Sequence, residues 1–402
     1  MRIQQIVVAS VIVMAALLLP AACTAPGSVP SSDTPIPPTD TAVPAAATPL
    51  PEAATALPRP ETAPTEPARE PLPFPLSEPG QYFTGTRQRE YIDTARGRRE
   101  VSVKVWYPAL RPEGKVTNRP AKDAAPNLSA APYPLLLMSS KVGDIFKRHL
   151  TSHGFVVAGV LVQDSSDSWD MWLIDYPLDL VFALSQIAAS PPDGLEGVIN
   201  VDRAGAMGYS FDGYTSLALS GARVDPTSYL NQCTEASNID PPLPSWWIEY
   251  TCALVESWDS FAVHAGEGLT SSDDGLWQPM TDTRIRAVMP MALEGAWLFG
   301  ERGLASVDRP TLIISASEDD INLYFQEAVY IFKHLSTPDR AMISFLDQGH
   351  MMVYSVEPVA RMSHFATAFF GYHLQGRLEY ADDFSPEFVG RHSDLVWGVH
   401  AE

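Results

Sequence analysis

The stretch that decides the fold is A-G-A-M-G-Y-S-F-D-G, residues Ala204 to Gly213. Its first five residues are small or apolar without alternation, which predicts a strand that is covered on both faces. The residues from 212 to 219 then follow a helical spacing. Ser210 therefore stands in a tight turn from a buried strand into a helix, where a hydroxyl is exposed above the edge of a sheet. This position predicts a nucleophilic serine, and a serine that only caps the helix is the alternative.

Short apolar segments alternate with helical patterns from Gly85 onward. This order predicts an α/β fold whose central sheet is mostly parallel and has helices on both faces. Two segments of alternating polarity predict an antiparallel edge hairpin at 86–92 and 101–107. Continuous apolar runs predict further strands at 134–138, 155–162, 204–208, 286–290, 311–314 and 341–345. Helices are predicted at 178–187, 212–219, 324–335 and 359–372. We interpret residues 225–282 as a loop-rich, cap-like insertion after the nucleophile helix.

A serine hydroxyl is a weak nucleophile at its ordinary pKa, so it needs a base and a group that orients the base. The acidic sequence E-D-D follows the strand at 311–314, at the edge where open α/β sheets place ligands. Asp319 is the expected acid, Asp320 is the alternative, and Glu318 is less well placed. His350 ends the sequence D-Q-G-H after the next strand. It is the histidine that follows both the serine and the acid and comes directly after a strand, which makes it the expected base.

The chain begins with Met1 and the basic Arg2, continues with an apolar run from Ile6 to Leu19 and then has P-A-A-C, which ends at Cys23. This is the three-part layout of a secretory signal, and the run of about 14 apolar residues is shorter than the roughly 20 of a membrane-spanning helix. The small residues before Cys23 resemble a bacterial lipoprotein signal, although Pro20 stands where leucine is usual. We expect residues 1–23 to be a signal peptide that ends at a lipidated Cys23, with an ordinary cleaved signal as the alternative. The protein would then be lipid-anchored on the extracytoplasmic face of the cell membrane.

Residues 24–75 are rich in Pro, Ala and Thr and poor in aromatic residues. Such a segment cannot bury enough apolar surface to fold, so we predict a disordered, semi-extended tether before a folded domain at 76–402.

The formal net charge is −21, from 27 basic and 48 acidic residues, and the sequence has no basic run. This charge balance gives a nucleic-acid-binding surface no electrostatic support.

Besides Cys23, the chain has two cysteines, Cys233 and Cys252. Because exported proteins meet oxidising conditions, we interpret these two as a disulfide pair, with two unpaired core cysteines as the alternative. The bridge would close a loop of about 19 residues and stabilise the fold by roughly 3 kcal/mol in the chain-entropy model.

These residues in this order resemble the α/β-hydrolase superfamily, and within it the plasma-type platelet-activating factor acetylhydrolases and their bacterial dienelactone-hydrolase-like relatives. The resemblance covers about residues 85–376. It includes R-R-E-V-S-V-K-V-W-Y-P from Arg98, L-T-S-H-G-F-V-V-A from Leu150, the elbow G-Y-S-F-D-G from Gly208 and the loop D-Q-G-H from Asp347. The resemblance implies the α/β-hydrolase fold, with Ser210 as nucleophile, Asp319 as acid and His350 as base.

The resemblance also implies an oxyanion hole that is built from backbone N–H groups. One donor would be Phe211, after the nucleophile, and the other Val142 or Lys141, after the third strand of the family's sheet. The sequence departs from the family at Ser140, Lys141 and Asp212, where His or Gly is usual.

The complete set of triad candidates predicts a membrane-anchored serine ester hydrolase that acts on short-chain or phospholipid-type acyl esters through an acyl-enzyme. The three departures support an alternative, a catalytically weak or inactive binding protein on the same fold. The sequence has no metal-ligand spacing and no dinucleotide or phosphate loop, so we expect no cofactor. Four tryptophans are candidates to line an acyl pocket, with plain packing as the alternative: Trp169, Trp172, Trp246 and Trp247.

Overall fold

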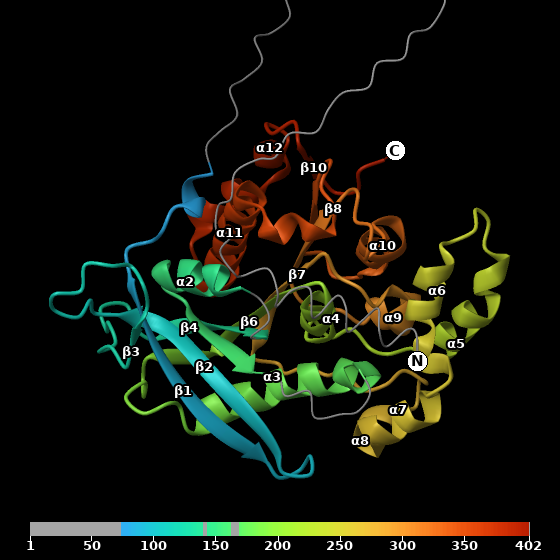
Figure 1. The fold of residues 1–402 in the computed structure, drawn as a ribbon, viewed down its shortest axis with the longest axis horizontal. Coiled ribbons are helices and arrows are strands. Elements are labelled where there is room, and N and C mark those ends of the chain that lie inside the picture. Colours follow the sequence, from blue (N-terminus) through green and yellow to red (C-terminus); the bar gives the residue numbers. More distant parts are fainter. Residues whose placement is uncertain (1–73, 140–142, 162–168, 402) are drawn as a thin grey trace, which may run out of the picture. The chain divides into compact units, whose positions relative to one another are not determined.

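A computed structural model describes residues 74–139, 143–161 and 169–401 (Figure 1). These residues form an α/β fold around one mixed, mostly parallel open sheet of ten strands, in the order β10-β9-β8-β7-β6-β4-β5-β2-β1-β3. The strands are β1 (Phe83–Asp93), β2 (Arg99–Ala109), β3 (Ala121–Lys122), β4 (Tyr133–Ser139), β5 (Val156–Leu161), β6 (Ile199–Tyr209), β7 (Ile285–Met291), β8 (Thr311–Ala316), β9 (Arg340–Phe345) and β10 (Leu395–Trp397). The predicted α/β class and mostly parallel sheet are confirmed.

The middle of the sheet is parallel, from β5 through β4, β6, β7 and β8 to β9. Its outer strands are antiparallel: β1 pairs with β2, β2 with β5, and β10 with β9. The predicted hairpin of β1 and β2 is confirmed, although the two-residue β3 lies outside it at the edge. Because β6 to β9 run in the same direction, the loops that follow them meet at one edge of the sheet.

The helices of the described residues are α2 (Asp144–Ser152), α3 (Trp172–Ala189), α4 (Phe211–Ala218), α5 (Pro226–Glu235), α6 (Ser245–Thr251), α7 (Trp258–Ala265), α8 (Glu267–Thr270), α9 (Ala296–Leu304), α10 (Tyr330–His334), α11 (Val356–Phe370) and α12 (Pro386–Val389). A π-helical turn, Phe325–Val329, precedes α10. Helices α3, α4, α10 and α11 correspond to the four predicted ones. The stretch Trp169–Ala189 is long and apolar enough to cross a membrane, but just over half of it is buried in the protein, as in a core helix.

Side chains of the sheet alternate between two helical layers, as a strand's period of two requires. In β4, Leu136 packs in one hydrophobic cluster with Phe365 of α11, whereas the next residue, Leu137, packs in another with Leu184 of α3. Helices α2 and α11 thus cover one face, and α3, α4 and α9 cover the other (Figure 1). Both faces are buried, which explains the continuous apolar runs of the central strands.

The segment 225–282 contains four short helices, α5 to α8, joined by turns and irregular segments. A start signal was present, because the Asp225 side chain accepts the backbone N–H of Ser228 at 3.1 Å and Pro226 begins the helix. The other helices are short, and such helices depend on tertiary packing. Four buried aromatic residues of the insertion provide it, in one cluster with α4 and α9: Tyr229, Trp247, Phe261 and Trp277. Cys233 and Cys252 form the predicted disulfide, with 5.6 Å between their Cα atoms.

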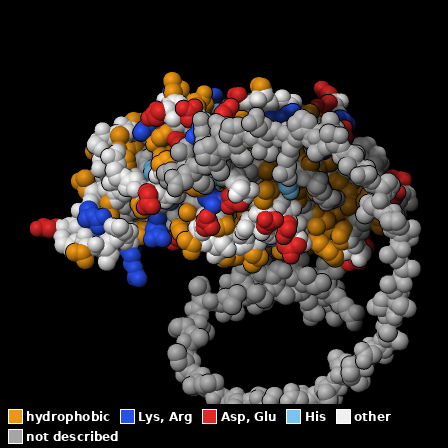
Figure 2. Space-filling view, turned by 90° about the horizontal axis from the view of Figure 1, so that it is seen from above, with side chains coloured by type: hydrophobic (Ala, Val, Ile, Leu, Met, Phe, Trp, Pro, Cys, Tyr) orange, Lys and Arg blue, Asp and Glu red, His pale blue; other side chains and the backbone are white. Residues whose placement is uncertain are grey.

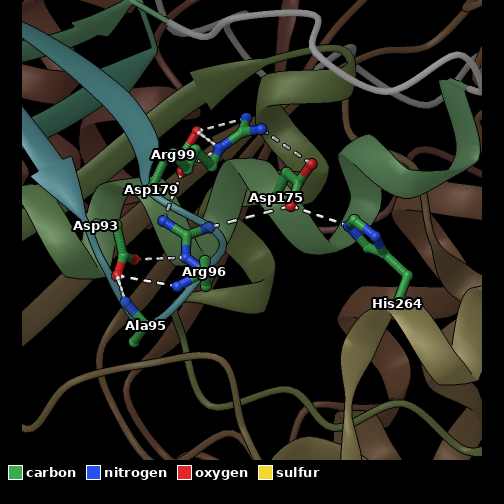
Figure 3. Close-up of polar contacts among 7 residues, drawn as sticks. All are labelled: Asp93, Ala95, Arg96, Arg99, Asp175, Asp179 and His264. Carbon is green, nitrogen blue, oxygen red and sulfur yellow. Dashed lines mark hydrogen bonds and ion pairs between the residues drawn. The ribbon is translucent and has the colours of Figure 1, made fainter.

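A cluster of ion pairs connects the β1–β2 hairpin and the insertion to α3 (Figure 3). From the hairpin, Arg96 and Arg99 donate to the carboxylate of Asp179 at 2.7 and 2.8 Å. Arg99 also lies 3.2 Å from Asp175, one helical turn earlier. On its other side Asp175 contacts Nε2 of His264, in α7, at 3.0 Å. Helix α3 therefore joins the first strands to the insertion through buried carboxylates.

Elsewhere on the surface, the face seen in Figure 2 has basic side chains spread among acidic and hydrophobic ones.

Candidate active site

Ser210 lies in a strained turn between β6 and α4. Its backbone has φ 60° and ψ −126°, a conformation that a non-glycine residue rarely adopts. The turn is tight: a Cβ atom on Gly208 would lie 2.0 Å from the carbonyl oxygen of Asp212. On Gly213 a Cβ would lie 2.7 Å from the carbonyl oxygen of Met291, at the end of β7. The second glycine of this elbow therefore stands at 213, where it lets α4 approach β7 closely.

Ser210, His350 and Asp319 form a continuous chain of hydrogen-bonding contacts. The Oγ atom of Ser210 lies 2.9 Å from Nε2 of His350. On the other side of the ring, Nδ1 lies 2.9 Å from Oδ2 and 3.0 Å from Oδ1 of Asp319. A carboxylate only accepts, so Nδ1 carries the proton and Nε2 is free to accept from the serine hydroxyl. The structure thus brings together the three residues that the sequence pointed to.

Asp319 is held in place by the loop that follows β8. Its Oδ1 accepts the backbone N–H groups of Ile321 at 3.0 Å and of Asn322 at 2.8 Å. Asp319 is buried, whereas the neighbouring Asp320 and Glu318 are exposed. Of the three acidic candidates, Asp319 is the one beside His350.

The backbone N–H of Phe211 is available next to the serine. Phe211 is the first residue of α4, and the first N–H groups of a helix have no acceptor within it. The other predicted oxyanion donors, Val142 and Lys141, lie outside the described residues, as do Ser140 and Cys23.

Asp212 is buried in the first turn of α4, and its Oδ2 accepts a hydrogen bond from the hydroxyl of Ser139, the last residue of β4. Asp212 is therefore part of a contact between the helix that follows Ser210 and the central sheet.

A pair of buried glutamates lies near the triad, and sequence reasoning missed it. Glu294 follows β7, the strand between those that lead to Ser210 and Asp319, and its Oε2 accepts the hydroxyl of Tyr250 in α6 at 2.9 Å. Burial raises the pKa of Glu294 to about 7. Glu327 accepts the backbone N–H of Ala296 at 2.9 Å, and burial, with the Glu294 charge as a smaller cause, raises its pKa to about 8. A signal existed for Glu294, because it follows a buried strand at the edge where the triad residues lie.

The four candidate tryptophans separate into different environments. Trp247 is buried and packs edge-on against Trp297, which makes it a core residue. Trp246 is 46% exposed. Trp169 stacks on Tyr250 with ring centroids 5.2 Å apart, and Trp172 lies edge-on to Phe211 at 6.3 Å. Trp172 and Trp169 are thus the two that connect to residues at the site.

Within residues 74–139, 143–161 and 169–401, no group of three or more His, Cys, Asp and Glu side chains is placed to hold a metal ion. The chain matches no model of a protein family. It is also similar to no curated protein. What identifies the site is its own geometry: a strained serine, a histidine and a buried aspartate in hydrogen-bonding contact at the carboxyl edge of an α/β sheet.

Proposed function

We propose that the protein is a serine hydrolase of carboxylic esters that works through an acyl-enzyme. The observation that carries the proposal is the contact chain from Ser210 Oγ through His350 to Asp319, with 2.9 Å on each side of the imidazole. A serine in hydrogen-bonding distance of a base, with the base oriented by a third group, is the arrangement that activates a hydroxyl. The left-handed backbone of Ser210 adds support, because strain of this kind gathers at active sites.

Acylation follows from the geometry. Nε2 of His350 takes the hydroxyl proton of Ser210 while Oγ attacks the carbonyl carbon of the ester. The imidazolium that forms is stabilised by the buried Asp319 carboxylate at Nδ1. The negative charge on the former carbonyl oxygen faces the N–H of Phe211 and the donor expected at Val142 or Lys141. When the C–O bond to the leaving group breaks, His350 gives its proton to that oxygen, and the alcohol leaves.

Deacylation uses the same groups in the opposite order. A water molecule takes the place of the alcohol, and His350 accepts its proton as the oxygen attacks the acyl carbon. The bond between that carbon and Ser210 Oγ breaks, and the proton returns from His350 to Oγ. The products are one alcohol and one carboxylic acid for each ester and water consumed.

Family and location belong to the same proposal. The strand-turn-helix around Ser210 and the chain order Ser, Asp, His support membership of the α/β-hydrolase superfamily. The sequence around Cys23 supports attachment to the outer face of a membrane, and the resemblance to platelet-activating factor acetylhydrolases supports short-chain or phospholipid-type acyl esters as substrates.

A fluorophosphonate probe tests the proposal, because labelling requires an activated serine. We expect the probe to label the wild-type protein, and its hydrolysis of p-nitrophenyl acetate or butyrate to fall in proportion to the labelled fraction. Ser210→Ala should show neither labelling nor hydrolysis. A matched control is Ser216→Ala, which changes a buried serine of the same helix whose hydroxyl donates to the carbonyl of Gly213. A folded wild-type protein that is neither labelled nor active would overturn the proposal and favour the binding protein.

A further inference from the structure

His350 lies on a short segment that is packed through only part of its length, because Met352 is buried in the main hydrophobic cluster whereas two of its neighbours are exposed. It begins a short 3₁₀ turn, His350–Tyr354, in which Met351 is 51% and Tyr354 60% exposed. The residues before it also leave regular structure, because Asp347 has a positive φ and Gly349 is extended. The imidazole contacts Asp319 and Ser210, but neither contact fixes the main chain that carries the ring. Met352 anchors the middle of the turn, and a further contact holds the main chain of His350 itself.

Tyr209 supplies that contact. It is the last residue of β6, immediately before the nucleophile, and its side chain is buried in the main hydrophobic cluster. Its hydroxyl donates to the backbone carbonyl of His350 at 2.5 Å, and its ring lies 5.6 Å from the imidazole, centroid to centroid. The backbone N–H of Val353, in the same turn, also interacts with the hydroxyl. One side chain therefore contacts both the first and the fourth residue of the turn.

The hydroxyl of Tyr209 is protonated at neutral pH. Burial raises the pKa of Tyr209 far above its ordinary value, and the nearby Asp319 carboxylate acts in the same direction. The contact is thus a neutral O–H donor to a carbonyl, and it does not depend on the protonation of the imidazole. It can hold the turn equally well before and after His350 takes up a proton.

We propose that Tyr209 is a positioning residue that sets the distance between Ser210 Oγ and His350 Nε2. The inference rests on the proposed function. Tyr209 and Ser210 are adjacent on one rigid strand, so the hydroxyl of Tyr209 joins the main chain of the base to the main chain of the nucleophile. The alternative is a tyrosine that only fills the core, for which loss of the hydroxyl would weaken the fold without a specific effect on the chemistry.

The test compares Tyr209→Phe with Tyr214→Phe. Tyr214 is a matched control, because it is also buried and its hydroxyl donates to a backbone carbonyl, that of Leu173, at 3.0 Å. Each variant keeps the ring and loses the hydrogen bond that its hydroxyl donates to a backbone carbonyl, so both should fold and show decreases of similar order in the midpoint of thermal unfolding. Near-ultraviolet circular dichroism checks that the aromatic core is intact in each.

For Tyr209→Phe we expect kcat for p-nitrophenyl butyrate to fall by 10- to 100-fold with KM within about twofold, because a displacement of about 1 Å in a reacting group can cost 100-fold. The rate of fluorophosphonate labelling should fall by the same factor. Tyr214→Phe should stay within twofold of wild type in all three quantities. Equal activity of the two folded variants, or a change confined to KM, would overturn the inference. A wild-type protein that the probe does not label would instead reject the proposed function, so the two failures are distinguishable.

Discussion

Replacing Glu327 with Gln should make the protein more resistant to alkaline pH. Burial raises the pKa of Glu327 from 4.5 to about 8 and that of Glu294 from 4.5 to about 7. A carboxyl whose pKa is higher in the folded than in the unfolded state stabilises the fold fully below the unfolded value. That contribution is lost as pH rises through the folded value. The wild-type protein should therefore lose stability steadily between about pH 4.5 and pH 8.

The size of the effect follows from the two pKa values of Glu327. Each pH unit between them costs about 1.4 kcal/mol, because the unfolded chain is ionised there and the folded one is not. From pH 5 to pH 7.5 this amounts to about 3 kcal/mol. Glutamine does not titrate, and its carbonyl oxygen can still accept the backbone N–H of Ala296. The stability of Glu327→Gln relative to wild type should thus increase by about 3 kcal/mol over that range.

Urea unfolding, followed by tryptophan fluorescence at half-unit steps from pH 5 to pH 8 with the disulfide intact, measures this difference. Glu387→Gln, at an exposed position, is the matched control for replacing a glutamate with glutamine. A Glu327→Gln curve that runs parallel to that of wild type would refute the reasoning. It would mean that Glu327 is ionised in the folded protein and is stabilised there by its backbone contacts.

Four further predictions concern the site and the chain that carries it. Ser210→Ala and His350→Ala should each remove nearly all esterase activity, and the double variant should cost little more, because the triad acts as a unit; additive losses would contradict this. Asp319→Asn should be far more damaging to kcat than Asp320→Asn, whose side chain is exposed, and the reverse order would assign the acid to the wrong residue. Replacing Cys233 and Cys252 together with Ala should lower the free energy of unfolding by roughly 3 kcal/mol, as measured in urea, and an unchanged midpoint would show that the bridge contributes nothing. Cys23→Ala should release the protein from the membrane fraction of its host, whereas unchanged fractionation would refute lipidation at this residue.

The sequence predicted those parts of the fold and site that depend on local pattern. The continuous apolar runs of the central strands and the small residues around Ser210 are local signals, and they led to Ser210, Asp319 and His350. Glu327 is different, because its raised pKa depends on burial between segments that are far apart in the chain. The hydroxyl of Tyr209 meets a carbonyl 141 residues away, and no spacing in the sequence reveals such a contact.

The helices of the insertion could likewise not be predicted from local sequence pattern. The aromatic residues and paired prolines of the insertion suggested loops, because short helices have weak intrinsic signals. Packing against α4 and α9 stabilises these helices, and that packing joins residues that are far apart in the chain. The Asp225 cap and Pro226 were local signs of a helix at the start of this region.

The position of the disulfide has a consequence for how this protein opens locally. Both cysteines belong to the insertion, so the bond ties α5 to the end of α6 and ties neither to the sheet. The disulfide therefore does not prevent a partial unfolding that separates the insertion from α4 and α9. In the oxidised protein, however, α5 and α6 must detach as one unit. In amide hydrogen exchange, these two helices would share one opening free energy when oxidised and acquire separate ones when reduced. Reduction thus changes the set of transiently open forms near the triad and leaves the sheet that carries Ser210 as it was.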